Sequence, residues 1–327
     1  MDGGGSDRGA HEPTPGFSVS ATVGSSMSTP EQVVDIECET GEGPLWHPED
    51  ERLYWCDIPK GRVYRYDPAV DDYECVYRDD DERIGGFTIQ RDGSLLLFQE
   101  AGAVRRLSRD NWTTETVVAP DPDRFHERFN DVIADPEGRV FAGVMPDTER
   151  DLPGRLYRLD TDGSFILVRE SCVLPNGMGF TPDLSHLYFT DTCEVDSSEP
   201  GYIYRYDYNC ASGRLSDPEV FVDASDIDGY PDGLTVDGEG HVWSAFWDGG
   251  ALHRFAPDGT HERTVAFDPR KVSSLTFAGD SYDTAYVTTA CVETRETEGA
   301  GAGSLYRVDL GVTGRPEFRS AVDPDRR

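Results

Sequence analysis

The stretch LPNGMGFTPDLSHLYFTD, residues 174–191, decides the fold because similar stretches recur along the chain. RFNDVIADPEGRVFAGVM (128–145) precedes it and YPDGLTVDGEGHVWSAFWDGG (230–250) follows it. Each contains an early Asn or Asp, continues as alternating apolar residues, turns at a cluster of Asp, Pro or Gly, and resumes as a second alternating run. Alternation with a period of two is typical of strands, and these turn residues are typical of hairpins. The three stretches therefore predict a repeated β-hairpin.

The rest of the chain can be aligned with these stretches as six units, whose starting positions lie 41 to 56 residues apart. Each unit reads as three strands and a weaker fourth, a pattern and period typical of β-propeller blades. We predict an all-β, six-bladed β-propeller that forms a single domain over residues 31–327. The segment EQVVDIEC, which begins at Glu31, has no partner in the first unit, so we expect it to pair with the last blade and close the ring. The starting positions are Glu42, Gly85, Asn130, Asn176, Asp232 and Ser273.

Residues 1–30 are rich in Gly, Ser, Pro and Thr and lack the basic start and apolar centre of a signal peptide. We expect a disordered leader there, with Met27 as an alternative start of translation. No apolar run reaches the length of a membrane span. The seven cysteines are scattered and form no C-x-x-C, which argues against a disulfide framework or a zinc-thiolate site. Together these features predict a cytoplasmic protein.

The chain is strongly acidic, with 63 Asp and Glu against 30 Lys and Arg and a net charge of -33. Such a charge repels phosphate and anionic lipid, so we expect no nucleic-acid partner and no membrane partner. Only Lys60 and Lys271 are lysines. We interpret this composition as a halophilic surface, because concentrated salt screens charges beyond about 3 Å. An acidic surface for a specific partner is the alternative.

The six starting positions have a common geometric meaning in a propeller, whose innermost strands line a central channel. Four of them carry a carboxylate or amide at one mouth of that channel: Glu42, Asn130, Asn176 and Asp232. Oxygen donors without sulfur or imidazole suit Ca²⁺, Mg²⁺ or Mn²⁺. Asn and Asp are also common turn residues, which is the alternative explanation, but Glu is a poor turn former. We therefore predict a divalent cation on the axis, with positions left for water and substrate.

The chain resembles the regucalcin and gluconolactonase-like lactonases over about residues 38–312, through the three stretches quoted first and GEGPLWHPEDERLYWCDIPKGRVYRYDP (41–68). Members of this family are six-bladed propellers with one divalent metal on the axis. The resemblance implies metal ligands at Glu42, Asn176 and Asp232, and leaves open whether Ca²⁺, Mg²⁺, Mn²⁺ or Zn²⁺ binds. It also implies substrate contacts from Arg128 and Asn130, which share one face of an extended segment.

One segment departs from the family pattern. Some members place a glutamate that holds substrate hydroxyls where this chain reads MPDTE, with Asp147 and Glu149 on either side of Thr148. The preference among sugar lactones is therefore open.

Elsewhere, Asp57 and Asp191 follow second strands and are expected to cap turns, and most of the seven histidines are expected at the surface. Of Trp243 and Trp247, which alternate on a strand, one is expected between two blades.

The resemblance implies metal-dependent hydrolysis of a sugar lactone, such as glucono-, xylono- or arabinonolactone, to the aldonic acid. Asp232 would act as metal ligand and catalytic base, and a metal-bound hydroxide is the alternative base. A related ester or organophosphate hydrolase and a non-enzymatic calcium-binding propeller are the competing hypotheses. Arg128 argues against the last, because a structural ion needs no adjacent cation. The sequence contains no G-x-S-x-G motif, which argues against a serine hydrolase. We expect a monomer or a weak homo-oligomer.

Overall fold

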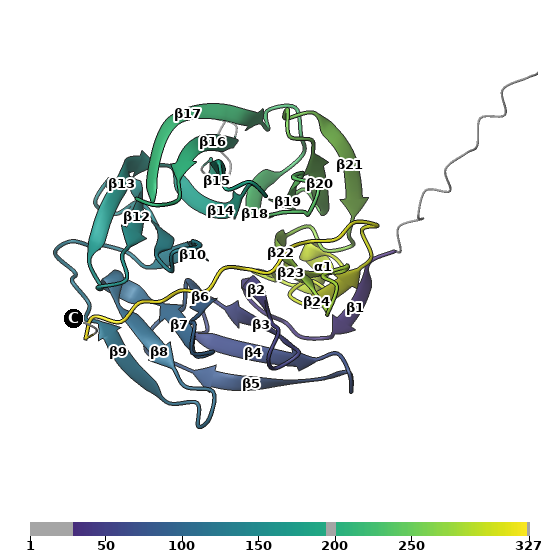
Figure 1. Ribbon diagram of the computed structural model, residues 1–327. Coiled ribbons are helices and arrows are strands. Elements are labelled where there is room, and N and C mark those ends of the chain that lie inside the picture. The colour runs from purple at the N-terminus through teal and green to yellow at the C-terminus, as the bar shows by residue number, and fades with distance from the viewer. Residues whose placement is uncertain (1–28, 194–200, 326–327) are drawn as a thin grey trace, which may run out of the picture.

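The computed structural model describes residues 29–193 and 201–325, which form six four-stranded antiparallel sheets around a central axis (Figure 1). The predicted six-bladed β-propeller is therefore confirmed. All but the last two residues of the predicted leader lie outside the described residues. The first two blades, from the axis outwards, are β2 (Gly41–His47), β3 (Arg52–Asp57), β4 (Arg62–Asp67) and β5 (Asp72–Arg78), then β6 (Gly86–Ile89), β7 (Leu95–Phe98), β8 (Val104–Leu107) and β9 (Thr114–Val118).

The third and fourth blades follow the same order, and the fourth contains the longest strand, β17. Their strands are β10 (Phe129–Ala134), β11 (Val140–Val144), β12 (Gly154–Leu159) and β13 (Phe165–Cys172), then β14 (Leu174–Phe180), β15 (His186–Thr192), β16 (Tyr202–Asn209) and β17 (Arg214–Asp223). The fifth blade consists of β18 (Tyr230–Val236), β19 (Val242–Trp247), β20 (Ala251–Phe255) and β21 (His261–Ala266).

The sixth blade joins the two ends of the described chain. Its inner strands are β22 (Val272–Ala278), β23 (Thr284–Thr289) and β24 (Leu305–Val308), and its outermost strand is β1 (Glu31–Val34). β1 pairs antiparallel with β24, with Glu31 opposite Arg307, and these two side chains form an ion pair of 2.7 Å. The predicted closure of the ring by the N-terminal segment is confirmed.

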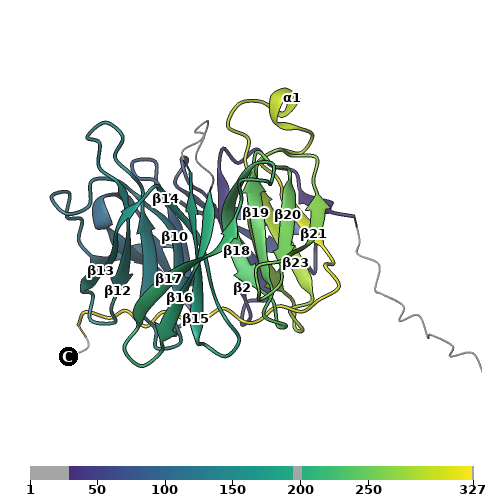
Figure 2. The same ribbon diagram turned by 90° about the horizontal axis from the view of Figure 1, so that it is seen from above.

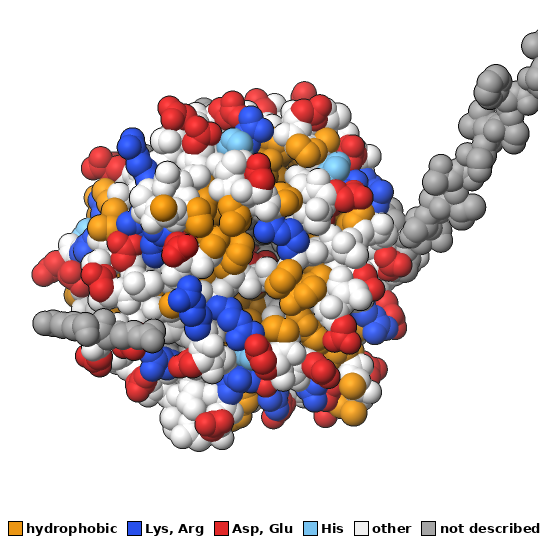
Figure 3. All heavy atoms as spheres, in the orientation of Figure 1, with side chains coloured by type: hydrophobic (Ala, Val, Ile, Leu, Met, Phe, Trp, Pro, Cys, Tyr) orange, Lys and Arg blue, Asp and Glu red, His pale blue; other side chains and the backbone are white. Residues whose placement is uncertain are grey.

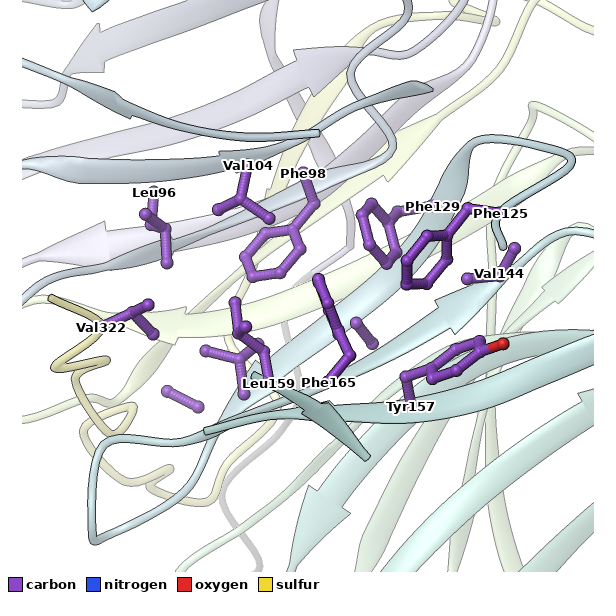
Figure 4. Packing of buried hydrophobic residues seen from close by; sticks show 13 residues of the cluster. Leu96, Phe98, Val104, Phe125, Phe129, Val144, Tyr157, Leu159, Phe165 and Val322 are labelled. Carbon is purple, nitrogen blue, oxygen red and sulfur yellow. The ribbon is translucent and has the colours of Figure 1, made fainter. Parts of the chain in front are cut away.

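The hydrophobic core lies between consecutive blades, as six separate clusters of buried side chains. Figure 4 shows the cluster between the second and third blades, where Phe98 and Phe129 pack edge to face with ring centroids 5.3 Å apart. Trp243 is fully buried between the fifth and sixth blades, whereas Trp247 is half-buried at the end of the same strand. The expectation that one of these tryptophans packs between blades is confirmed.

Five of the inner strands have an irregular register at or beside their starting position. In β14, for example, the pairing with β15 shifts between Pro175 and Met178, and in β18 it shifts between Pro231 and Leu234. The same irregularity occurs in β2, β10 and β22. A β-bulge changes the direction of a side chain relative to the regular ladder. The bulges therefore release Asn130, Asn176, Asp232 and Ser273 from the ladder, whereas Glu42 is still paired with Cys56 and the shift follows it.

The tail, residues 311–325, crosses the face of the ring opposite the short helix α1 (Arg295–Glu298) (Figures 1 and 2). Its backbone bonds to several blades, including Ser320 N to Ile89 O at 2.9 Å and Ala321 N to Gly138 O at 2.8 Å. Glu317 lines small cavities near the axis. Figure 3 views this face and shows acidic side chains around its rim.

Two smaller sequence expectations are tested by the fold. Cys38, Cys56, Cys75, Cys172, Cys210 and Cys291 are free thiols. In the part of the chain that the structure describes, the helical element besides α1 is the 3-10 turn η1 (Glu100–Gly102). Among residues 29–193 and 201–325, no helix has the length and apolar character needed to cross a membrane.

Candidate active site

The starting residues of four blades meet at a cavity of about 200 Å³ at the mouth of the channel that the tail leaves uncovered. Glu42, Asn130, Asn176 and Asp232 come from β2, β10, β14 and β18, and Arg128 precedes β10. All five side chains predicted from the sequence as site residues therefore lie at one cavity. The other lining residues are Thr40, Ile58, Met145, Leu174, Thr192, Tyr230 and Trp247.

The carboxylates of the cavity are buried and close enough to repel one another. Glu42 is 4% exposed and Asp232 is 6% exposed. Burial raises the pKa of both well above the ordinary range, and nearby carboxylates raise it further. Burial also raises the pKa of half-buried Asp131, which lines the channel, to about 6. Buried carboxylates are costly unless a cation compensates them, so this cluster favours binding of a positive ion.

A chain of directional hydrogen bonds fixes the two amides of the cavity. Arg128 donates from Nη1 to Asn130 Oδ1 at 2.7 Å, and Asn130 Nδ2 donates to Pro175 O at 3.0 Å and also to Asn176 Oδ1. Asn176 Nδ2 in turn donates to Thr192 Oγ1 at 2.7 Å. Because a backbone carbonyl can only accept, the Pro175 contact identifies the amino group of Asn130 and leaves its oxygen toward Arg128.

The donor set of the cavity fits a hard divalent cation. Glu42, Asn176 and Asp232 supply two carboxylates and one amide oxygen, and the lining contains no cysteine or histidine. Ca²⁺, Mg²⁺ and Mn²⁺ prefer such oxygen ligands, and buried like charges gain most from a bound cation. A site with this few protein ligands also leaves positions for water or substrate.

The walls of the cavity combine one guanidinium with apolar surface. The pKa of Arg128 is lowered by burial and by the neighbouring charge of Arg83. Arg83 is itself ion-paired with Glu100 and Glu127. Trp247 lies across the cavity lining, and Lys271 Nζ lies 5.5 Å from its ring centroid. The ammonium group of Lys271 therefore makes a cation–π contact with the Trp247 indole, and the same indole borders the cavity.

Lys271 belongs to a partly buried ion-pair group that anchors the helix α1. Its Nζ lies 2.9 Å from Asp248 and 2.6 Å from Glu298, which is only 1% exposed. The other lysine, Lys60, pairs with Asp57 at 3.0 Å. Both lysines of this lysine-poor chain thus support segments next to the cavity.

Asp57 and Asp191 occupy equivalent places at the ends of second strands, and both bind backbone N–H groups. Asp57 accepts from Glu39 N at 3.1 Å and Thr40 N at 3.2 Å. Asp191 accepts from Val173 N at 2.8 Å, and from the N–H of the next residue. The capping expectation is confirmed, and the capped segments are those that enter the inner strands beside the cavity.

In the segment that departs from the family pattern, Met145 lines the cavity, whereas Asp147, Thr148 and Glu149 do not. Asp147 accepts from Arg150 N at 3.0 Å, and the two side chains lie 3.5 Å apart. Arg150 also contacts His126 Nδ1 at 3.3 Å. The expectation that most histidines lie at the surface is wrong for His47 and His253, which are 0% and 7% exposed. His47 is buried because its ring bonds to a neighbouring hairpin turn at Gly93 O, 3.0 Å away.

The two starting positions without an amide or carboxylate serve the joints between blades. A Cβ atom on Gly85 would lie 1.9 Å from Phe129 O, so only glycine permits this backbone approach. Ser273 is fully buried and donates from Oγ to Gly41 O at 2.5 Å. Small residues at these positions therefore have a packing role that the sequence pattern did not reveal.

A second acidic group, Asp237, Glu239 and His241, lies within the described chain on the turn between β18 and β19. Arg254 forms ion pairs with both carboxylates of this group, with Nη2 at 2.8 Å from Asp237 and 2.6 Å from Glu239. Asp237 also accepts from the indole N–H of Trp243 at 3.1 Å. Because its carboxylates already have a cationic partner, this group fits a structural ion-pair network better than a metal site.

Fold and cavity together define a six-bladed propeller with an acidic, oxygen-lined axial site. Over residues 40–291 the chain matches the family described as SMP-30/Gluconolactonase/LRE-like region, and it belongs to that family. The resemblance inferred from the sequence is thereby confirmed.

Similar proteins include the pentonolactonase XacC of Haloferax volcanii, which is 45% identical over 298 residues, covering 89% of this chain and 98% of that protein. The 6-deoxy-6-sulfogluconolactonase of Pseudomonas putida is 29% identical over 283 residues, covering 85% of this chain and 93% of that protein. Among solved structures, the calcium-binding protein regucalcin of Agrobacterium tumefaciens has a TM-score of 0.79 at 22% identity, covering 88% of this chain and 96% of that one.

Proposed function

We propose that this protein is a metal-dependent lactonase that hydrolyses sugar lactones to aldonic acids, with pentonolactones as the preferred substrates. The chain is a lactone-ester hydrolase by its family and its relatives. The observation that carries the proposal is the meeting of Glu42, Asn176 and Asp232 with Arg128 at one cavity. The pentonolactone preference rests on the 45% identity with a pentonolactonase that covers 98% of that relative.

In this proposal Glu42, Asn176 and Asp232 would hold a divalent cation, which supplies Lewis acidity toward the lactone carbonyl. Arg128 donates hydrogen bonds to the lactone, because its guanidinium is the charged donor in the cavity wall. Asn130 is already oriented by Arg128 and Pro175 O, so its amide can position the sugar without first reorganising. Trp247, Met145 and Leu174 supply apolar walls that restrict water around the ring.

Asp232 accepts a proton from the attacking water, whose oxygen forms a bond to the carbonyl carbon. The bond between that carbon and the ring oxygen then breaks, and the proton is passed to the departing ring oxygen, which becomes the hydroxyl of the open acid. The product carboxylic acid releases a proton to solvent at neutral pH. This release provides a direct assay for the reaction.

The acidic composition leads us to propose that the reaction takes place in concentrated salt, because the net charge of -33 repels itself at low ionic strength. Activity measured across a range of KCl concentrations tests this part of the proposal. Activity that rises with salt supports it, and activity that is highest in dilute buffer contradicts it.

The proposal is tested by following proton release from xylono-, arabinono-, galactono- and gluconolactone at high salt with added Mg²⁺, Mn²⁺, Ca²⁺ or Zn²⁺. Asp232→Ala should lose turnover by a factor of about 10³ or more, in the range of losses from groups that act in the transition state. Asp258→Ala removes the same charge from an exposed turn of the same blade and should retain activity. Equal activity of the two variants, or no turnover by wild type on any of these lactones, would contradict the proposal.

A further inference from the structure

Several joints between blades are made by a side chain that donates to the carbonyl just before a starting residue of the next blade. Ser273 donates to Gly41 O, which precedes Glu42, and Asn130 donates to Pro175 O, which precedes Asn176. At the joint between the fourth and fifth blades the donor is Thr192, whose Oγ1 lies 2.5 Å from Pro231 O.

Thr192 ends β15 and is 4% exposed at the cavity wall. Its backbone is fixed by pairing with Leu174 in the ladder between β14 and β15. The carbonyl of Pro231 can only accept a hydrogen bond, so the hydroxyl proton of Thr192 points to it. The lone pairs of the hydroxyl then face Asn176 Nδ2, 2.7 Å away.

This polarity determines which end of the Asn176 amide faces the cavity. With Nδ2 bound to Thr192, Oδ1 faces Asn130 and the cavity, where it accepts from Asn130 Nδ2 and keeps its second lone pair for a cation. A reversed amide would present an amino group to the cation and would place two acceptors, its own oxygen and the Thr192 hydroxyl, in contact. The hydroxyl thus selects the ligating orientation.

The same hydroxyl joins two candidate ligands on different blades. Thr192 bonds to the amide of Asn176 on one side and to the carbonyl of Pro231 on the other, and Pro231 is bonded directly to Asp232. Both hydrogen bonds are buried, where their loss leaves unsatisfied polar groups. One side chain from β15 therefore links the position of Asn176 to that of Asp232.

We propose that Thr192 is a positioning residue of the candidate metal centre, whose hydroxyl holds Asn176 Oδ1 toward the cation and fixes its place relative to Asp232. This inference rests on the proposed function, because the amide orientation matters only if its oxygen binds the cation. Loss of an outer partner that orients a metal ligand typically lowers metal affinity by about 10-fold to 100-fold. We expect a loss of this size when the hydroxyl is removed.

Thr190 offers a matched control on the same strand. It is fully buried, and its hydroxyl has no hydrogen-bond partner among the residues described. Thr190→Val therefore removes a buried hydroxyl from β15 without breaking a bond to the cavity. Thr192→Val removes the hydroxyl that bonds Asn176, and Thr192→Ser retains a hydroxyl at the same place.

The test is calorimetric titration of the metal-free proteins with Mn²⁺ at fixed salt, with thermal unfolding of each metal-free variant to verify folding. We expect Thr192→Val to weaken Mn²⁺ binding by about 10-fold to 100-fold, and Thr192→Ser and Thr190→Val to remain within about threefold of wild type. Equal Mn²⁺ affinity of Thr192→Val and wild type would overturn the inference while leaving the proposed function intact. A failure of wild type to bind Mn²⁺, Ca²⁺ or Mg²⁺ would overturn both.

Discussion

Replacing Glu317 by Gln should change how the free energy of unfolding depends on pH. Glu317 lies on the tail and borders two small cavities near the axis, of about 60 Å³ and about 30 Å³. Burial raises the pKa of its carboxyl from 4.5 to about 7, and Arg315 offsets this only in part. The tail therefore carries an acid that the folded protein keeps protonated at mildly acidic pH.

The sign of the effect follows from comparing the folded and unfolded chains. Between pH 4.5 and about 7 the folded protein retains the Glu317 proton that the unfolded chain has lost, so stability decreases as pH rises through this range. One pKa unit corresponds to about 1.4 kcal/mol of folding free energy. The shift of the Glu317 pKa from 4.5 to about 7 therefore lowers the free energy of unfolding above pH 7 by at most about 3 kcal/mol. Glu317 is only partly buried, so screening by solvent reduces this amount, and we expect about 1–3 kcal/mol.

Urea unfolding at pH 5 and pH 8, at one fixed salt concentration, measures this contribution as the difference between Glu317→Gln and wild type. Glu317→Gln should be more stable than wild type by about 1–3 kcal/mol at pH 8, and the difference should shrink at pH 5. Glu296→Gln, on the exposed face of α1, changes the same charge away from the axis and should show no such pH dependence. A difference between Glu317→Gln and wild type that is the same at both pH values would refute the reasoning.

Two further predictions concern the cavity and the ring. Arg128→Met should lower kcat/KM for the preferred lactone by about 10²-fold or more, because a charged hydrogen-bond donor is lost from the cavity. The control is Arg150→Met, which should stay near wild type because Arg150 is 63% exposed and lies outside the cavity. Equal losses of kcat/KM in the two variants would contradict the role of Arg128. A chain that begins at Asp35 lacks β1 and the buried side chain of Val34, so its free energy of unfolding in urea should fall by at least about 2 kcal/mol relative to a chain that begins at Met27. An unchanged unfolding midpoint in the shorter chain would show that β1 does not stabilise the closed ring.

The fold was predictable because the repeated hairpins carry both the strand period and the turn residues of each blade. The convergence of Glu42, Asn130, Asn176 and Asp232 was predictable too, since equivalent positions of a ring share one mouth. The bulges beside these residues could not be predicted, because a shift in strand pairing does not change the alternating pattern of the sequence.

The supporting contacts were hidden for a different reason, since they join residues of different blades. Thr192 follows Asp191 directly, yet only the three-dimensional contact with Pro231 O shows what its hydroxyl does. Gly85 is only a small starting residue in the sequence, and its role in a close backbone approach depends on Phe129 of the next blade. His47 stands at a hairpin turn in the sequence, but the neighbouring hairpin buries it.

The central claim is that Glu42, Asn176 and Asp232 hold one divalent cation at the cavity. Anomalous diffraction from crystals grown with Mn²⁺ tests it most directly, because the ion is located without reference to activity. The account predicts one strong peak within about 2.0–2.6 Å of oxygen atoms from these three side chains, at distances usual for such ions. A peak at the group of Asp237, Glu239 and His241 instead, or no peak at the cavity at saturating Mn²⁺, would contradict it.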